Sequence, residues 1–142
     1  MKEIRGDLWD FYDKAIVVIT TGGLVTMRSE CAMPRGCARQ ARDRFPGLAL
    51  RLGLLIQEKG NHVHDLGNGL VSFPVENSPY ERPDLRLVER SCRELVSLTN
   101  LNRWPEVVVP RPGCGAGGLS WGEVRPILER HFDDRFLVID RI

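Results

Sequence analysis

The chain has 142 residues, with 20 lysines and arginines against 19 aspartates and glutamates, and a formal net charge of +1. This length suits one domain with its own core, and the balanced charge excludes the strongly basic surface typical of nucleic-acid-binding proteins. With 42% hydrophobic residues the chain is globular, yet no run approaches the roughly 20 apolar residues of a membrane span. The first residues lack the apolar segment of a signal peptide, and none of the four cysteines forms a C-x-x-C pair. We therefore expect a reduced, cytoplasmic protein without a metal or cofactor.

The first half of the chain alternates between strand and helix patterns. The continuous apolar run Ala15–Thr20 is typical of a strand buried on both faces. A glycine-rich loop leads from this strand to a helix that begins near Gly36 and is broken at residues 45–47. Leucines at helical spacing from Leu48 then predict a second amphipathic helix that ends near Gly60.

Two further strands, His62–Leu66 and Leu70–Pro74, flank Gly67-Asn68-Gly69, which is a strong hairpin signal. A long helix follows from Pro83, and Asp84 in its first turn would favour the positive end of the helix dipole.

The last third of the chain repeats the alternation. Glu106–Val109 is predicted as a buried strand and Phe136–Ile139 as the last strand. Between them Ser120 and Glu123 form a capping box that opens a helix running to about Arg130. Strands that alternate with helices around one hairpin predict an α/β protein whose mixed sheet is covered on both faces.

Two strand-to-helix loops are unusually rich in glycine, and in open α/β sheets ligands bind where such loops lie. The first covers residues 20–38. The second, residues 110–119, holds four glycines in six residues and leads directly into the capped helix. Glycines let backbone N–H groups approach a ligand, so the second loop is predicted to cradle an anion. It is not a P-loop, because no G-K-[ST] follows, and no G-x-G-x-x-G follows the first strand.

Four short motifs, in this order, resemble those of the macrodomain family, an ADP-ribose-binding α/β/α module. Gly6-Asp7-Leu8 resembles the family's early G-D-[IL], and Gly36-Cys37-Ala38 resembles the end of its first binding loop. Phe73-Pro74 sits where the DNA-deADP-ribosylating antitoxin branch has F-P-T-K. Residues 113–121 resemble the G-C-G-x-G-G-L-x-W phosphate loop of that branch and its phage-borne relatives. The resemblance implies a bacterial or phage protein with a three-layer α/β/α fold, a mixed sheet of about six strands and a single macrodomain over residues 1–142.

The resemblance also implies where a ligand would lie. ADP-ribose or a derivative would occupy a cleft between the two glycine-rich loops, with Asp7 and Leu8 at the adenine. The amides of residues 115–119 would hold the diphosphate, and those of residues 36–38 would face the distal ribose. The implied ligand-binding residues are Asp7, Leu8, Thr20, Thr21, Gly36, Cys37, Ala38, Pro112, Gly113, Cys114, Gly115, Ala116, Gly117, Gly118 and Leu119.

Two departures from the antitoxin branch concern its catalytic residues. Glu76 stands where that branch has a lysine, and residues 20–22 lack its asparagine. Glu76 could orient water or hold ribose hydroxyls, and Arg35 could pair with a terminal phosphate, so these two are the candidate catalytic residues. Three functions stay open: a hydrolase that removes ADP-ribose from a modified protein or nucleic acid, an ADP-ribose 1''-phosphate phosphatase, and a non-catalytic ADP-ribose reader. We expect a monomer with no membrane partner.

Several other side chains fit either a site or the core. Cys37 and Cys114 lie near predicted helix starts, where the pKa of a thiol falls, but no histidine is placed beside them and packing is favoured. His62 and His64 would share one face of a strand, as in metal sites, but no third ligand is evident. Trp9 could stack on the adenine or pack in the core.

Overall fold

The structure, a computed structural model, describes residues 1–141 and holds one six-stranded sheet in the order β1-β6-β5-β2-β4-β3. None of the helices in these residues is long and apolar enough to cross a membrane. The strands are β1 (Lys2–Arg5), β2 (Ile16–Thr21), β3 (His64–Gly67), β4 (Leu70–Pro74), β5 (Val107–Pro110) and β6 (Phe136–Asp140). The helices are α1 (Gly36–Arg44), α2 (Leu48–Lys59), α3 (Leu85–Asn102), α4 (Trp121–His131) and the short 3₁₀ helix η1 (Leu8–Phe11).

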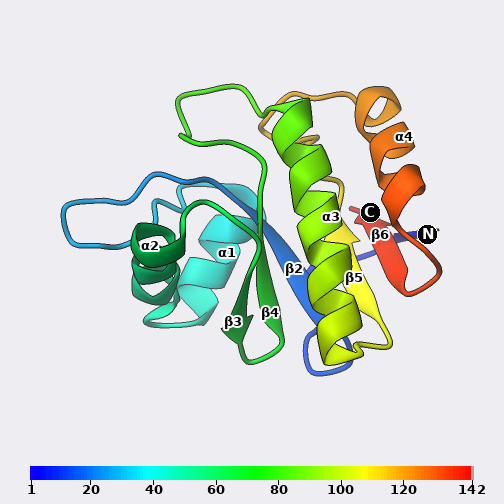
Figure 1. Cartoon of the computed structure of the whole chain (residues 1–142), viewed down its shortest axis with the longest axis horizontal. Coiled ribbons are helices and arrows are strands. Elements are labelled where there is room, and N and C mark those ends of the chain that lie inside the picture. The colour runs from blue at the N-terminus through cyan, green and yellow to red at the C-terminus, as the bar shows by residue number, and fades with distance from the viewer. Residues whose placement is uncertain (142) are drawn as a thin grey trace.

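The predicted α/β architecture with a mixed sheet is confirmed. Only the β3–β4 hairpin is antiparallel among the strand pairs of residues 1–141, and the other four pairs are parallel. β1 is not among the strands predicted from the sequence; it pairs with β6 and places the chain start beside the last strand (Figure 1). β1 is largely exposed, so it lacks the apolar signal of an inner strand.

Strand β2 lies inside the sheet, between β5 and β4, because its run of β-branched residues can be buried on both faces. Val17 and Ile19 point to the face covered by α1 and α2, whereas Val18 points to the face covered by α3 and α4. All three side chains are fully buried. The alternation of side chains along one strand thus builds two cores, one on each side of the sheet.

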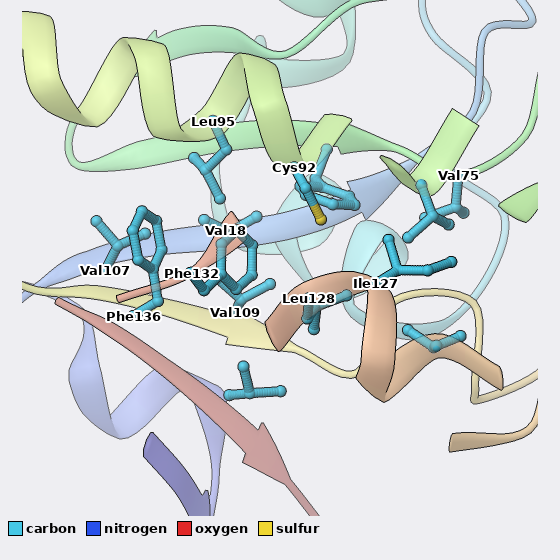
Figure 2. Close-up of a cluster of buried hydrophobic side chains, with 14 of the residues drawn as sticks. Val18, Val75, Cys92, Leu95, Val107, Val109, Ile127, Leu128, Phe132 and Phe136 are labelled. Carbon is cyan, nitrogen blue, oxygen red and sulfur yellow. The ribbon is translucent and has the colours of Figure 1, made fainter. Parts of the chain in front are cut away.

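The core between the sheet and helices α3 and α4 is drawn in Figure 2, where Val18, Val107 and Val109 of the sheet face Cys92 and Leu95 of α3. Helix α4 closes this core with Ile127 and Leu128. The rings of Phe132 and Phe136, which flank the turn into β6, are stacked with centroids 4.3 Å apart.

Two helix starts are fixed by side-chain caps. The predicted capping box is confirmed: Ser120 accepts from the backbone N–H of Glu123, whose carboxylate accepts from the backbone N–H of Ser120. The predicted placement of Asp84 within the first turn of α3 is wrong by one position. The helix begins at Leu85, and Asp84 precedes it as the N-cap, where its carboxylate accepts from the backbone N–H of Arg86 at 2.9 Å.

The chain leaves the central strands β2 and β5 in different directions. The loop after β2 leads to α1 on one face of the sheet, and the loop after β5 leads to α4 on the other face. Adjacent parallel strands whose loops diverge in this way leave a crevice at their carboxyl ends. The segments that follow β4 and β5 run together along the upper side of Figure 1, at this end of the sheet.

Candidate ligand-binding site

A cavity of about 500 Å³ opens at the carboxyl ends of β2 and β5. Its size lies within the range of small-molecule sites. Its walls come from the end of β2, the start of α1, the β4–α3 loop, the β5–α4 loop and the end of β6. The predicted site residues that line it are Thr20, Thr21, Arg35, Gly36, Cys37, Ala38, Glu76, Gly113, Cys114, Gly115, Ala116, Gly117 and Leu119.

Two runs of backbone N–H groups on the cavity wall have no oxygen acceptor among residues 1–141. One run is residues 36–38, the first turn of α1, where a helix leaves its N–H groups unpaired. The other is residues 115–117, in the glycine-rich β5–α4 loop. Because both runs carry partial positive charge into one cavity from two sides, they can hold an anion that spans the gap.

The β5–α4 loop is held in a fixed shape by a close approach of its own backbone. The N–H of Leu119 donates to the carbonyl of Gly113 at 2.9 Å, which closes the loop. A Cβ at Gly117 would lie 2.8 Å from that same carbonyl oxygen and 2.6 Å from Cγ of Pro83. Only glycine fits at this position, so the unpaired N–H groups are presented by a loop packed against the β4–α3 loop.

At one end of the cavity a carboxylate and a guanidinium face each other. Glu76 lies on the β4–α3 loop, and its Oε2 is 3.8 Å from Nη2 of Arg35, the N-cap of α1. Burial raises the pKa of the Glu76 carboxyl, and the positive charge of Arg35 offsets part of that rise, while the negative charge of Glu81 adds to it. The cavity therefore contains one carboxyl group that takes up a proton more readily than an exposed glutamate.

The opposite end of the cavity is built around Arg111, the residue directly after β5. Its guanidinium lies 4.4 Å from the centroid of the Trp121 ring and within 3.6 Å and 4.0 Å of the carboxylates of Asp140 and Glu3. Nε of Arg111 is buried and has no hydrogen-bond partner in residues 1–141. These contacts tie the β5–α4 loop to the ends of β1, β6 and α4.

The sequence matches no protein-family model and no curated protein. Solved structures do match it over nearly its whole length. The macrodomain of Mycobacterium tuberculosis DarG has a TM-score of 0.76 at 20% identity, covering 96% of this chain and 96% of that chain. The macrodomain of Thermus aquaticus DarG has a TM-score of 0.73 at 20% identity, covering 97% of this chain and 95% of that chain. Thermosipho africanus DarTG in complex with ADP-ribose has a TM-score of 0.74 at 18% identity, covering 98% of this chain but 41% of that chain.

The chain has the macrodomain fold. The fold implied by the sequence motifs, a mixed sheet of six strands between helices, is thereby confirmed. This macrodomain fold also brings together the two glycine-rich loops, although Gly36 of the first loop and Gly113 of the second are 77 residues apart in the chain (113 − 36).

Four of the predicted site residues do not line the cavity of this macrodomain fold. The carboxylate of Asp7 accepts from the backbone N–H of Trp9 at 2.9 Å and caps η1, and Leu8 is buried in the core. Pro112 and Gly118 belong to the β5–α4 loop but lie outside the lining. Contact between Asp7 and a ligand stays a prediction.

The expected fall in thiol pKa near the helix starts is wrong. Cys37 and Cys114 do line the cavity, but burial raises the pKa of both thiols. The Sγ of Cys37 lies 3.3 Å from Oγ1 of Thr20, and the Sγ of Cys114 donates to the carbonyl of Pro112 at 3.5 Å. Both cysteines are therefore protonated packing residues, in agreement with the favoured interpretation.

The two histidines near β3 have structural partners. His62 precedes the strand and its Nδ1 is 2.8 Å from a carboxylate oxygen of Glu94, while Nε2 of His64 is 2.9 Å from the carbonyl oxygen of Gly60. Within residues 1–141 no group of three or more histidine, cysteine or acidic side chains is placed to hold a metal ion. Trp9 packs in the core, with Nε1 donating to the side chain of Gln40 at 2.8 Å.

Sequence reasoning did not identify Pro83, Arg111 and Asp140 as part of the site. Pro83 and Asp140 come from segments without a glycine signal, and Arg111 lies in the glycine-rich residues 110–119 but had no role assigned to it. Arg111 and Asp140 nevertheless share one sequence feature, a charged residue at the carboxyl end of a predicted strand. In an open α/β sheet that position faces the ligand crevice, so this feature could have identified both.

Proposed function

We propose that this chain binds ADP-ribose in the cavity between the β2–α1 and β5–α4 loops. The observation that carries the proposal is the pair of unpaired N–H runs at residues 36–38 and 115–117 on facing walls. A diphosphate can accept from the residue 115–117 run, while the oxygen atoms of the distal ribose accept from the residue 36–38 run. The likeness of the fold to a protein solved in complex with ADP-ribose supports this choice of diphosphate.

In this proposal the two ends of the ligand lie at different ends of the cavity. The adenine would lie near Trp121 and Arg111, close to the carboxyl ends of β1 and β6, where Asp7 and Leu8 begin η1. The N–H of Gly6 donates to the carbonyl of Asp140 at 2.9 Å, which places the start of η1 beside this end. The distal ribose would then lie near the start of α1 and Glu76.

Thermal unfolding in the presence of three nucleotides tests the choice of ligand. We expect ADP-ribose at 100 times its Kd to stabilise the fold by ~2.7 kcal/mol, which raises Tm by roughly 5–10 °C. ATP and NAD at the same concentration are expected to give smaller shifts, because ATP lacks the distal ribose and NAD carries a nicotinamide on C1'', where ADP-ribose has a hydroxyl. A shift with ATP equal to that with ADP-ribose would show that the cavity binds a different nucleotide.

We further propose that the chain hydrolyses the bond between ADP-ribose and a modified protein or nucleic acid. The carboxylate of Glu76 takes a proton from a water molecule whose oxygen attacks C1'' of the distal ribose. The bond from C1'' to the acceptor atom breaks, and the acceptor leaves with the electron pair and takes up one proton. Support comes from the position of Glu76 inside the cavity and from the raised pKa of its carboxyl, since a base works best with a pKa near the working pH.

Glu76→Gln is expected to lower turnover of ADP-ribosylated substrates by about 100-fold or more, because a positioned general base contributes at least that factor. In the wild type, turnover should fall as the pH drops through the raised pKa of Glu76, since the base must be unprotonated. The acidic limb should vanish from the profile of the variant. The matched control is Glu58→Gln, which removes an exposed carboxylate of α2 that neither lines the cavity nor acts on the pKa of Glu76.

A non-catalytic reader of ADP-ribose is the second candidate. No histidine or lysine lines the cavity in the described part of the chain, and both cavity cysteines have a raised thiol pKa. Glu76 is thus the group placed to act as a base at the distal-ribose end, because the other lining carboxylate, Asp140, pairs with Arg111 at the opposite end. ADP-ribose binding without turnover on ester-linked, glycosidically linked and nucleic-acid-linked ADP-ribose would establish the reader.

A further inference from the structure

The carboxylate of Glu76 is turned toward the interior of the cavity rather than toward solvent. Its side chain is 12% exposed, whereas the side chain of its partner Arg35 is 45% exposed. Arg35 immediately precedes Gly36, so the pair marks the end of the cavity formed by the start of α1. If the distal ribose of a ligand faces the amides of residues 36–38, the substituent on its C1'' therefore lies next to the Glu76 carboxylate.

Three independent contacts hold Glu76 in this place. A Cβ at Gly22 would lie 3.2 Å from Cγ of Glu76, so the bare backbone at the end of β2 leaves room for the glutamate side chain to lie across it. The side-chain amide of Asn61 donates to the backbone carbonyl of Glu76 at 3.1 Å and to Oδ1 of Asn77 at 3.0 Å. The third contact is the ion pair with Arg35.

Asn61 is in turn held in place by contacts with α3 and with the loop after β2. Arg90 of α3 donates to the backbone carbonyl of Asn61, and the side-chain amide of Asn61 fills the space beside Gly23, where a Cβ would lie 2.6 Å from Nδ2. The α2–β3 loop thus supports the backbone under Glu76. Because the backbone of Glu76 is held from several elements, its carboxylate stays at this end of the cavity when a like charge approaches.

We infer that Glu76 is a specificity-determining residue that excludes ADP-ribose derivatives ending in a phosphate and admits those ending in a hydroxyl or another hydrogen-bond donor. This inference rests on the proposed binding of ADP-ribose. A terminal hydroxyl can donate to the carboxylate, whereas a terminal phosphate brings a second set of negative oxygens against it. The ADP-ribose 1''-phosphate phosphatase considered from the sequence is disfavoured on the same ground.

Arg35 is the one cationic side chain that lines this end of the cavity in the described part of the chain, and one of its nitrogens is already engaged. Its Nη2 donates to the carbonyl of Pro79 at 3.2 Å as well as pairing with Glu76. A phosphate that drew Nη2 away from these partners would leave the Glu76 carboxylate without its counter-charge. The arrangement therefore presents the carboxylate to the ligand and directs the guanidinium outward.

The test compares the Kd values of ADP-ribose and ADP-ribose 1''-phosphate for the wild type, Glu76→Gln and the control Glu58→Gln, whose lost carboxylate is exposed on α2 and away from the cavity. We expect the wild type and the control to prefer ADP-ribose at least about tenfold, because like charges in contact suppress binding. In Glu76→Gln the ratio of the two Kd values should fall at least about fivefold, since glutamine has the same shape without the charge. Circular dichroism confirms that each variant is folded.

Equal affinity of the wild type for both ligands would overturn the inference while leaving ADP-ribose binding intact. So would an undiminished preference in Glu76→Gln, or release of inorganic phosphate from ADP-ribose 1''-phosphate by the wild type. If the wild type binds neither ligand, the proposed function fails and the inference fails with it.

Discussion

Gly117→Ala is expected to weaken ADP-ribose binding at least about 100-fold, which corresponds to ~2.7 kcal/mol. The new Cβ would lie 2.8 Å from the carbonyl oxygen of Gly113 and 2.6 Å from Cγ of Pro83, and one of these is backbone that cannot turn away. The loop must open, and the N–H groups of residues 115–117 then lose their common direction. Two misplaced hydrogen bonds to a charged diphosphate account for a loss of this size, at about 1.5–3 kcal/mol each.

Gly122→Ala is the matched control for this variant. It lies a few residues further along, in the first turn of α4, and a Cβ there would have Ser120 Oγ as its nearest neighbour at 3.9 Å. Alanine is a better helix former than glycine, so the control should be as stable as the wild type or more so. Isothermal titration of both variants with ADP-ribose gives the comparison. Equal affinities would mean that the shape of the β5–α4 loop does not govern binding.

Gly53→Ala is expected to lower the free energy of unfolding by about 3 kcal/mol or more, at the upper end of the cost of overpacking. Gly53 lies on the side of α2 that contacts the β2–α1 loop. A Cβ there would lie 2.7 Å from the carbonyl carbon of Ser29 and 2.8 Å from the backbone nitrogen of Cys31. The same loop is tied to α2 by the N–H of Cys31, which donates to the carbonyl of Ala49 at 2.8 Å. Alanine would therefore separate the loop from the helix.

Denaturant unfolding measures this effect, and Leu54→Ala on the same helix is its control. Leu54 is 49% exposed, so its truncation should cost less than about 1 kcal/mol. A Gly53→Ala variant as stable as this control would contradict the close packing of the loop on α2. Because the β2–α1 loop leads to Gly36, the destabilised variant should also bind ADP-ribose more weakly.

Much of the fold follows from local sequence patterns. The run Ala15–Thr20, the hairpin around Gly67-Asn68-Gly69 and the capping box at Ser120 each satisfy a local physical requirement, and the structure confirms all three. β1 was not identified because its position depends on pairing with a strand at the other end of the chain, which no local pattern of polar residues reveals. The start of α3 was misplaced because a proline and an aspartate fit either the first turn or the N-cap.

For the candidate site too, local patterns predicted some features, whereas features that depend on contacts between distant segments were missed. Its glycine-rich walls were predictable, because glycines that precede a helix indicate a backbone anion cradle without knowledge of the rest of the fold. The charged ends of the cavity were predictable only in part. Glu76 and Arg35 were singled out separately, but their pairing depends on Gly22 and on Asn61, which belongs to a loop with no sequence signal for a site.

Isothermal titration of the wild-type chain with ADP-ribose shows whether the cavity at the carboxyl ends of β2 and β5 binds this ligand. We expect one site with micromolar affinity, about −8 kcal/mol. An absence of binding at millimolar ADP-ribose would contradict this expectation, and the macrodomain fold would then describe the architecture of this protein and not its function.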